Sequence, residues 1–447
     1  ILRDADGRFV DERLRQKNYN VDDNNVSSES KWARLKADWS ISKAWRLRNE
    51  FYRFDADRNW RNSEVYAFNP ATLLIDRDRF FVSHDQEIKG NRLELSHRGS
   101  FGGRDNLFLV GVDYSQLDFF RPSSFEGGDS VDPFDPAPGL YGTLVNAVRT
   151  TKLTTAALFA EDQFSVTDKL KLMLGLRAES IDLLREDFNS DGSPRADGID
   201  RKFHPKSGRL GATFEALPGL NLYAQYATSA DIASNTSNLF LIRAAQNFDL
   251  AKGRQFEIGL KQRFWDNRGV WTFAWYDIER RNLLSRTAAD VVSNVGKQSS
   301  DGIELAVALQ PTAALRLSAN YALTHARYDR YRDTGSGAVY DGNTPPNVPK
   351  HVANLEAAYR LPAMPLELGA RVRHVGKRTG NDANTLELLS YTTLDASIAW
   401  IFKHARLSLH GRNLTDEDYV AWADVFYPTQ VLLGAPRSYE IVLSARF

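Results

Sequence analysis

The feature that most constrains this chain is an alternation of apolar and polar residues with a period of two, which recurs along most of its length. Within residues 170–177 every even position is leucine, while the odd positions hold lysine, methionine, glycine and arginine. Residues 256–261, 315–322 and 366–373 repeat the pattern. Because successive side chains on a strand point to opposite faces, the sequence predicts an all-β fold whose strands have one apolar face.

Strand length and connection length distinguish a barrel from a sandwich. Many alternating segments run for about 10–15 residues, whereas strands of soluble domains average about 5–6 residues and a tilted membrane-crossing strand needs about 9–11. Short turns alternate with longer polar connections, which include 57–86, 120–150, 186–202, 283–295, 330–348 and 415–436. This asymmetry is typical of outer-membrane barrels and predicts a transmembrane antiparallel β-barrel.

The composition is compatible with such a barrel and excludes several other classes of protein. No stretch of about 18 apolar residues exists, which excludes helical membrane spans. The mean hydropathy of −0.43 fits a barrel, in which only alternate residues face lipid. The absence of cysteine excludes disulfides and thiolate sites. The balance of 57 basic and 57 acidic residues gives no basic field for nucleic acid.

The strand count predicts that residues 1–447 form a single domain that is part of a barrel. We count about 17 strands between Lys31 and Phe447, whereas bacterial single-chain barrels have even numbers. The first strand precedes a short turn and the last strand follows a long loop, so both run toward the side of the short turns. A strand running the other way is therefore expected upstream.

Several motifs then occur in a fixed order along the chain. They are F-A-E-D-Q with L-G-L-R (159–163 and 174–177), F-E-I-G-L-K (256–261), D-G-I-E-L (301–305), N-V-P-K-H (347–351), N-L-T-D-E-D-Y (413–419) and the terminal phenylalanine. This set resembles the C-terminal barrel of TonB-dependent siderophore receptors, and N-Y-N-V at 18–21 resembles their ferrichrome-type branch. Phe159 stands where that family usually has tyrosine.

The resemblance carries expectations about the whole protein. Outer-membrane transporters have about 22 strands, so about five first strands and the N-terminal plug are expected to be absent here. The family imports ferric siderophores across the bacterial cell outer membrane, with TonB acting through the plug. Iron would arrive chelated by the siderophore, so the resemblance implies no cofactor and no protein metal site.

Aromatic residues in or beside the long loops are the candidate ligand contacts, because aromatic faces suit bulky, partly apolar siderophores. These residues are Phe426, Trp422, Tyr427, Phe119, Phe120, Trp60 and Tyr66. A role in loop packing or in an interfacial girdle is the alternative. Arg177, Lys261, Arg371 and Arg373 are expected on lumenal faces. They could guide an anionic ferric chelate, or pair with one another or with the plug.

Three other functions stay open at the level of sequence. They are a passive porin-like channel, a soluble β-sandwich binding module and an outer-membrane hydrolase. No G-x-S-x-G elbow or phosphate loop is present, which argues against an enzyme. D-F-N-S-D-G at 187–192 matches the first half of a calcium loop, but Gly198 occupies the position of the bidentate carboxylate. Bound calcium and a solvated loop both remain possible there.

Overall fold

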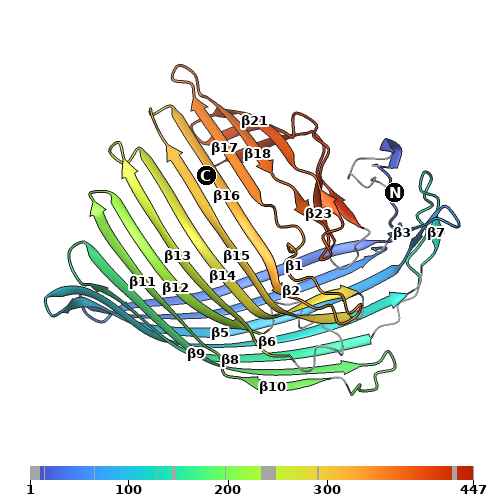
Figure 1. Cartoon of the computed structure of the whole chain (residues 1–447), viewed down its shortest axis with the longest axis horizontal. Coiled ribbons are helices and arrows are strands. Elements are labelled where there is room, and N and C mark those ends of the chain that lie inside the picture. Colours follow the sequence, from blue (N-terminus) through green and yellow to red (C-terminus); the bar gives the residue numbers. More distant parts are fainter. Residues whose placement is uncertain are drawn as a thin grey trace.

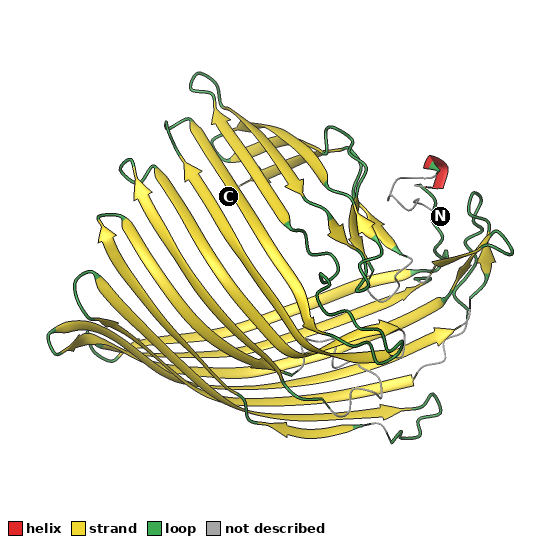
Figure 2. Cartoon of the chain, in the orientation of Figure 1, coloured by secondary structure: helices red, strands yellow, loops and turns green. Residues whose placement is uncertain are grey.

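The computed structural model describes residues 11–14, 16–64, 66–126, 128–142, 147–196, 198–232, 248–288, 291–424 and 430–445. In this part of the chain the regular structure is one 3-10 turn, η1 (Glu12–Leu14), and β-strands (Figure 2). No helix here is long and apolar enough to cross a membrane. The predicted all-β fold is confirmed.

One antiparallel sheet of 18 strands contains most of the described residues (Figure 1). Each strand pairs with its neighbours along the chain. β10 and β11 pair with consecutive stretches of β9 and act as one interrupted strand, so the 18 strands fill 17 positions, which agrees with the predicted count. The strands are β1 (Asn25–Ser40), β2 (Trp45–Asn62), β5 (Arg79–Phe101), β6 (Arg104–Glu126), β8 (Ala147–Ser165), β9 (Leu170–Phe188), β10 (Ile199–Phe203), β11 (Lys206–Leu217), β12 (Leu220–Asp231), β13 (Ala251–Phe264), β14 (Gly269–Ala288), β15 (Val291–Leu309), β16 (Leu315–Arg330), β17 (His351–Arg360), β18 (Leu366–Val375), β21 (Tyr391–Ile401), β22 (Ala405–Arg412) and β25 (Ser438–Ala445).

The sheet curls strongly but does not close (Figure 1). Among the described residues β1 pairs with β2 alone, and β25 pairs with β22 alone. Both outer strands therefore keep one free edge. The structure is a barrel wall with a gap between β1 and β25.

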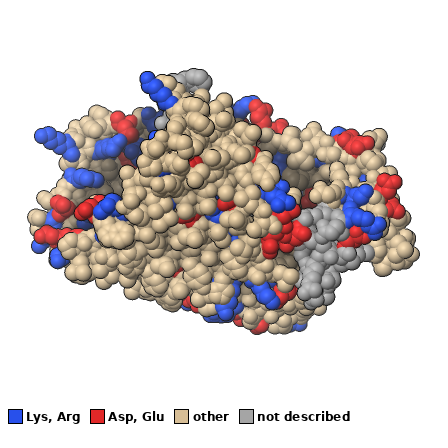
Figure 3. All heavy atoms as spheres, turned by 90° about the horizontal axis from the view of Figure 1, so that it is seen from above, with Lys and Arg blue, Asp and Glu red and all other residues tan. Residues whose placement is uncertain are grey.

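The two faces of the sheet differ in chemistry as the alternation predicted. Leu158 and Leu176 lie on the outer face with 58% of each side chain exposed. The inner face carries charges, such as the pair between Arg209 Nη2 and Glu161 Oε2 at 2.6 Å. Figure 3 shows one outer surface with few charged side chains in its middle and more toward its two ends. This apolar belt is the surface that a bilayer would cover.

The last strand confirms the predicted orientation of its side chains. Tyr439, Ile441 and Leu443 share the outer face and are 68%, 74% and 69% exposed. Phe447, which was predicted to share that face, lies outside the described residues.

Several strands extend further than the sequence pattern indicated. The predicted connection 283–295 largely belongs to β14 and β15, and the predicted loop 57–86 contains the end of β2 and the start of β5. Backbone pairing continues past the apolar belt, where the outward positions become polar. The apolar alternation stops at the edge of the apolar belt, but the strand does not.

Small sheets lie beyond the strand ends on the side of the long loops (Figure 1). They are formed by β3 (Tyr66–Asn69), β4 (Leu74–Arg77) and β7 (Ser130–Val131), by β19 (Arg378–Thr379) and β20 (Glu387–Leu388), and by β23 (Val420–Ala423) and β24 (Val431–Leu433).

Arg77 joins the first of these small sheets to neighbouring segments. Its fully buried guanidinium contacts the two carboxylate oxygens of Asp129 at 2.6 and 3.0 Å. It also donates to the carbonyl oxygens of Tyr19 at 2.8 Å and Ala137 at 2.9 Å. We call residues 17–24, β3, β4, β7 and 128–142 the first-loop assembly.

Candidate functional site

A run of cationic side chains faces the lumen near the long-loop ends of β2 to β9. Arg58 on β2 stands directly across from His84 on β5, and Arg121 on β6 stands across from Arg149 on β8. Arg185 follows on β9, on the same face. We call Arg58, Arg121, Arg149 and Arg185 the arginine row. Its outward neighbours, such as Asp57, Asp85 and Glu186, are polar, so the row lies above the apolar belt.

A buried carboxylate, that of Asp187, lies among the members of the arginine row. Asp187 accepts contacts from Arg149 Nε at 2.5 Å and Arg185 Nε at 2.9 Å. Opposed residues in an antiparallel pair have Cβ atoms about 4.5–5.5 Å apart, and like charges there are destabilising. Arg121 and Arg149 are such a pair. The sequence therefore places a local electrostatic cost in the lumen wall.

Two predicted ligand residues lie beside this row. The guanidinium of Arg58 lies 4.6 Å from the centre of the Trp60 ring, and Trp60 Nε1 donates to Glu64 Oε2 at 3.1 Å. Phe119 is 4% exposed, and its ring centre lies 5.3 Å from that of His84. The wall thus combines cations with aromatic faces, a combination suited to a partly apolar anion.

The adjacent Phe120 lies on the opposite face of β6 and is 44% exposed. Because neighbouring residues of a strand point to opposite sides, the pair Phe119 and Phe120 divides between lumen and exterior. Only Phe119 belongs to the lumenal wall.

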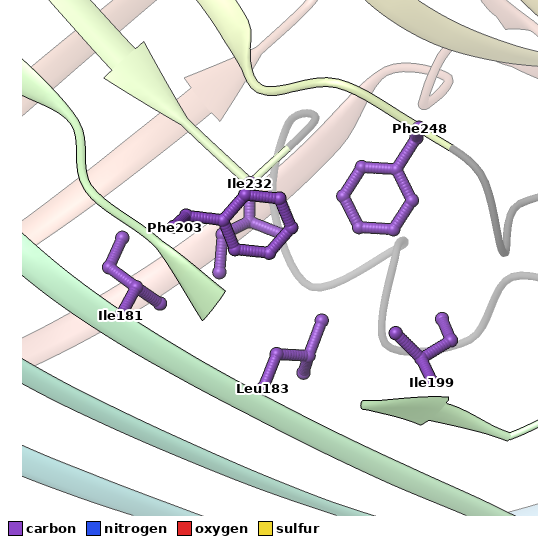
Figure 4. Packing of buried hydrophobic residues seen from close by; sticks show 6 residues of the cluster. All are labelled: Ile181, Leu183, Ile199, Phe203, Ile232 and Phe248. Atoms are coloured by element: carbon purple, nitrogen blue, oxygen red, sulfur yellow. The ribbon is translucent and has the colours of Figure 1, made fainter. Parts of the chain in front are cut away.

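An apolar cluster, shown in Figure 4, includes Leu183, which lies two residues from Arg185 on the same face of β9. Ile181 and Leu183 on β9 pack with side chains of β10 and of the segments that flank residues 233–247. The full buried set is Ile181, Leu183, Ile199, Phe203, Ile232 and Phe248, with Leu117 and Leu153 packed against it. Arg201 lies over Phe203 and Phe248 at 4.8 and 5.3 Å from the ring centres. The cluster extends the wall with apolar surface.

The other predicted aromatics lie in the loops. Tyr66 packs against Tyr19 with ring centres 5.9 Å apart, and burial raises the pKa of its phenol to about 12. Trp422 lies on β23 and is 39% exposed. Gln430 Nε2 donates to the carbonyl oxygen of Glu64 at 3.2 Å, which brings the last loop beside the β2–β3 connection. Phe426 and Tyr427 lie outside the described residues.

Two of the four predicted lumenal cations are paired with acids of the wall. Arg177 contacts Glu179 at 2.8 Å, and Arg371 contacts Glu356 at 3.1 Å. Lys261 and Arg373 form no ion pair within the described part of the wall. A hollow of about 700 Å³ near the short turns is lined by charged residues, including Glu356 and Arg371. This charge pairing is consistent with a structural role for Arg177 and Arg371.

The calcium-like segment is arranged differently from a calcium loop. The carboxylate of Asp187, its first residue, is held by Arg149 and Arg185, which would repel a cation. The side chain of Asp191 accepts hydrogen bonds from the backbone and hydroxyl of Ser193. The described residues contain no group of three or more His, Asp or Glu side chains that could hold a metal ion.

Two of the sequence motifs anchor loops. Asn347 exchanges two hydrogen bonds of 2.8 Å with the backbone of Ala423. Asn413 has a φ of 48°, and its side chain bonds the backbone of Glu417 and Ala435 at 2.9–3.0 Å. Tyr419, at the end of the same motif, stacks on Tyr391 at 4.0 Å. These motif residues fix the last long loop to the barrel.

The arginine row was not predicted from the sequence. Its members lie where the apolar alternation has ended, so they looked like loop residues. Extending the parity of Leu158 and Leu176 up β8 and β9 would have assigned Arg149 and Arg185 to the inner face. The strand ends, however, could not be located from the sequence alone.

The apolar outer belt, the charged inner face and the loops gathered on one side are the features of a large β-barrel of the outer-membrane type. The model for the family described as "TonB dependent receptor-like, beta-barrel" matches residues 3–414. The chain belongs to this family, whose members are receptors and transporters and not enzymes.

Relatives and solved structures agree with this assignment. The ferrichrome outer membrane transporter/phage receptor of Escherichia coli is 26% identical over 416 residues, which cover 87% of this chain and 52% of that protein. The probable TonB-dependent siderophore receptor PiuA of Acinetobacter baumannii is 29% identical over 277 residues, covering 59% of this chain and 37% of that protein. Its crystal structure matches with a TM-score of 0.82 at 21% identity, covering 95% of this chain and 65% of that one. The ferric-catecholate import receptor Fiu of E. coli gives a TM-score of 0.84 at 19% identity, covering 96% and 66%. The chain thus spans about half the length of the ferrichrome transporter.

Proposed function

We propose that the complete protein is an outer-membrane receptor that imports a ferric siderophore with energy delivered through TonB. The observation that carries this proposal is the family match over residues 3–414. The names of the relatives support it, since they include receptors for ferrichrome, ferrioxamine and metal-pseudopaline. In this proposal the iron arrives already chelated, and the protein supplies no metal ligand of its own.

We further propose that the complete barrel contains strands beyond those of this chain, and that a plug domain fills its lumen. Unpaired backbone groups in a bilayer cost several kcal/mol each, so the free edges of β1 and β25 need partners. A barrel of about 22 strands would require about five more than the 17 positions seen here. The paired charges of the inner face, which surround the hollow near the short turns, would line the space that a plug occupies.

A passive porin-like channel is the transport alternative, but the relatives named above are receptors and transporters. The two functions differ in how they hold a solute. The full-length protein, purified in detergent, should bind a panel of ferric siderophores saturably, and deleting its gene should slow growth on one of them under iron limitation. Weak, non-saturable interaction with every ferric siderophore tested would contradict the proposal.

A further inference from the structure

A group of cations on the outer surface of β13 to β16 lies directly above the apolar belt. The belt ends here at Phe256 and Trp275, which are 40% and 37% exposed and whose ring centres lie 6.1 Å apart. Arg254 lies two residues from Phe256 on the same face of β13, toward the long loops. The cross-strand register continues this face through β14, β15 and β16. We call Arg254, Arg281, Lys297 and Arg327 the outer cation patch.

The cations of this patch are more exposed than the acids that they contact. The carboxylate of Glu279, whose side chain is 5% exposed, contacts three of the cations at 2.5–3.0 Å. The fourth cation, Arg327, contacts two aspartates at 3.1 Å. Between 36% and 58% of each cationic side chain is exposed, so the outward surface consists mainly of N–H donors. The described acids of this face are Asp277, Glu279, Asp301 and Asp329, and its described cations are the four of the patch and Lys252.

The corresponding surface on another part of the wall is acidic. Arg53 lies two residues from the exposed Phe51 on the outer face of β2, as Arg254 does from Phe256 on β13. Acids outnumber cations around it, since this part of the outer face carries Arg53 and Lys89 together with Asp55, Asp57, Asp85, Glu87 and Asp118. The outer cation patch is therefore a local property of β13 to β16 and not a general property of the surface above the belt.

A partner of the patch must carry both an anion and an apolar part, because the patch is continuous with the apolar belt. Guanidinium groups form paired hydrogen bonds with phosphate oxygens, and basic side chains beside a membrane attract anionic headgroups. The long loops of an outer-membrane barrel are extracellular, so the patch lies at the level of the outer leaflet. We propose that the patch binds the phosphate groups of an outer-leaflet lipid whose acyl chains pack on Phe256 and Trp275. This inference rests on the proposed place of the protein in the outer membrane.

The test measures lipid binding to the full-length protein in detergent by native mass spectrometry. The probes are lipid A and the same lipid A with its phosphates removed, so that they differ only in the phosphate groups. We expect lipid A to bind at least about tenfold more tightly, a difference of about 1.4 kcal/mol. The double variant Arg254→Gln/Arg281→Gln should remove most of that preference and leave the affinity for the dephosphorylated probe within about twofold.

The buried carboxylate of Glu279 keeps Lys297 as a partner in the double variant. Heat-dependent gel mobility reports whether the barrel is folded. If the double variant does not fold, the single variants Arg254→Gln and Arg281→Gln take its place, because each leaves Glu279 with two cationic partners. Each single variant should lose part of the preference for lipid A, and an unchanged preference in both would contradict the proposal.

Arg53→Gln is the matched control, because Arg53 is an outer-face arginine that is 47% exposed and contacts Asp55 and Glu87. It should leave the preference for lipid A unchanged. Equal affinity of the wild type for the two probes, or an equal loss of preference in Arg53→Gln, would overturn the inference. Displacement of lipid A by inorganic phosphate alone would also overturn it, because the patch would then bind a free anion. All of these results leave the import function standing, since the binding of ferric siderophores is measured separately on the same proteins.

Discussion

Removal of the Arg77 side chain should release the first-loop assembly while the barrel stays folded. Arg77 has no exposed side-chain surface and makes four hydrogen bonds of 2.6–3.0 Å, two to Asp129 and two to backbone carbonyls. Breaking a buried ion pair costs about 3–5 kcal/mol. Because the Asp129 side chain is 48% exposed and also contacts Arg79 at 3.1 Å, we expect the lower end for Arg77→Ala. A loss of about 3 kcal/mol corresponds to a roughly 100-fold faster local opening.

Hydrogen exchange followed by mass spectrometry measures that opening directly. Protection should fall in residues 17–24 and 128–142 and stay unchanged in the ladder between β13 and β14, which lies away from these loops. Arg53→Ala is the control, since Arg53 contacts Asp55 at 2.8 Å but is 47% exposed, and such surface pairs contribute about 0–1 kcal/mol. Unchanged protection in Arg77→Ala, or an equal effect of Arg53→Ala, would refute the reasoning from burial.

Three further predictions test the loops and the membrane face. The hydrogen bonds from Arg77 lower the pKa of Asp129 from 3.8 to about 2. A carboxyl group whose pKa is lowered by folding stabilises the folded state at pH values above the pKa that it has in the unfolded chain. Hydrogen exchange in the first-loop assembly should therefore stay slow above about pH 4 and become faster as the pH falls toward 2. Asn413→Ala should lower the stability of the last loop by about 1–3 kcal/mol through lost hydrogen bonds and make the loop more sensitive to protease. Asn413→Gly should recover only the part of that stability that is lost through the positive φ. Equal cleavage of wild type and both variants would contradict this. Leu176→Arg, at an outer-belt position that is 58% exposed, should cost about 2–4 kcal/mol in a bilayer, measured by denaturant unfolding from vesicles; a cost near zero would argue against a lipid-facing belt.

The barrel could be predicted because one face of each strand suits lipid and the other suits water, which produces a regular alternation of apolar and polar residues in the sequence. The leucines at 170–176 face the outer surface, and the residues between them face the lumen, so the alternation follows from the pleat of the strand. The number of strands followed from the same pattern and from the turns. The ends of the strands could not be predicted, because outward residues such as Asp57 and Glu186 stand in water, where no apolar signal marks a strand.

The candidate site was predictable only in part for the same reason. Aromatic residues near the loops were identifiable, but Phe119 and Phe120 are adjacent and only the register separates the lumenal residue from the outer one. Arg121 and Arg149 are 28 positions apart by their numbers and become opposed only through the pairing of β6 and β8. A cluster of charges that forms only when strands pair gives no local pattern in the sequence.

The motif residues that identified the family and the arginines of the lumen wall have different structural roles. Asn347 and Asn413 both have positive φ values and use their amides to hold backbone of the last loop. Asparagine tolerates that conformation and can bond the chain locally, so few other residues could serve. The four arginines of the row lie in strand backbone and none has a positive φ, so they have no such backbone requirement. Backbone conformation therefore restricts the motif asparagines and does not restrict the side chains of the row.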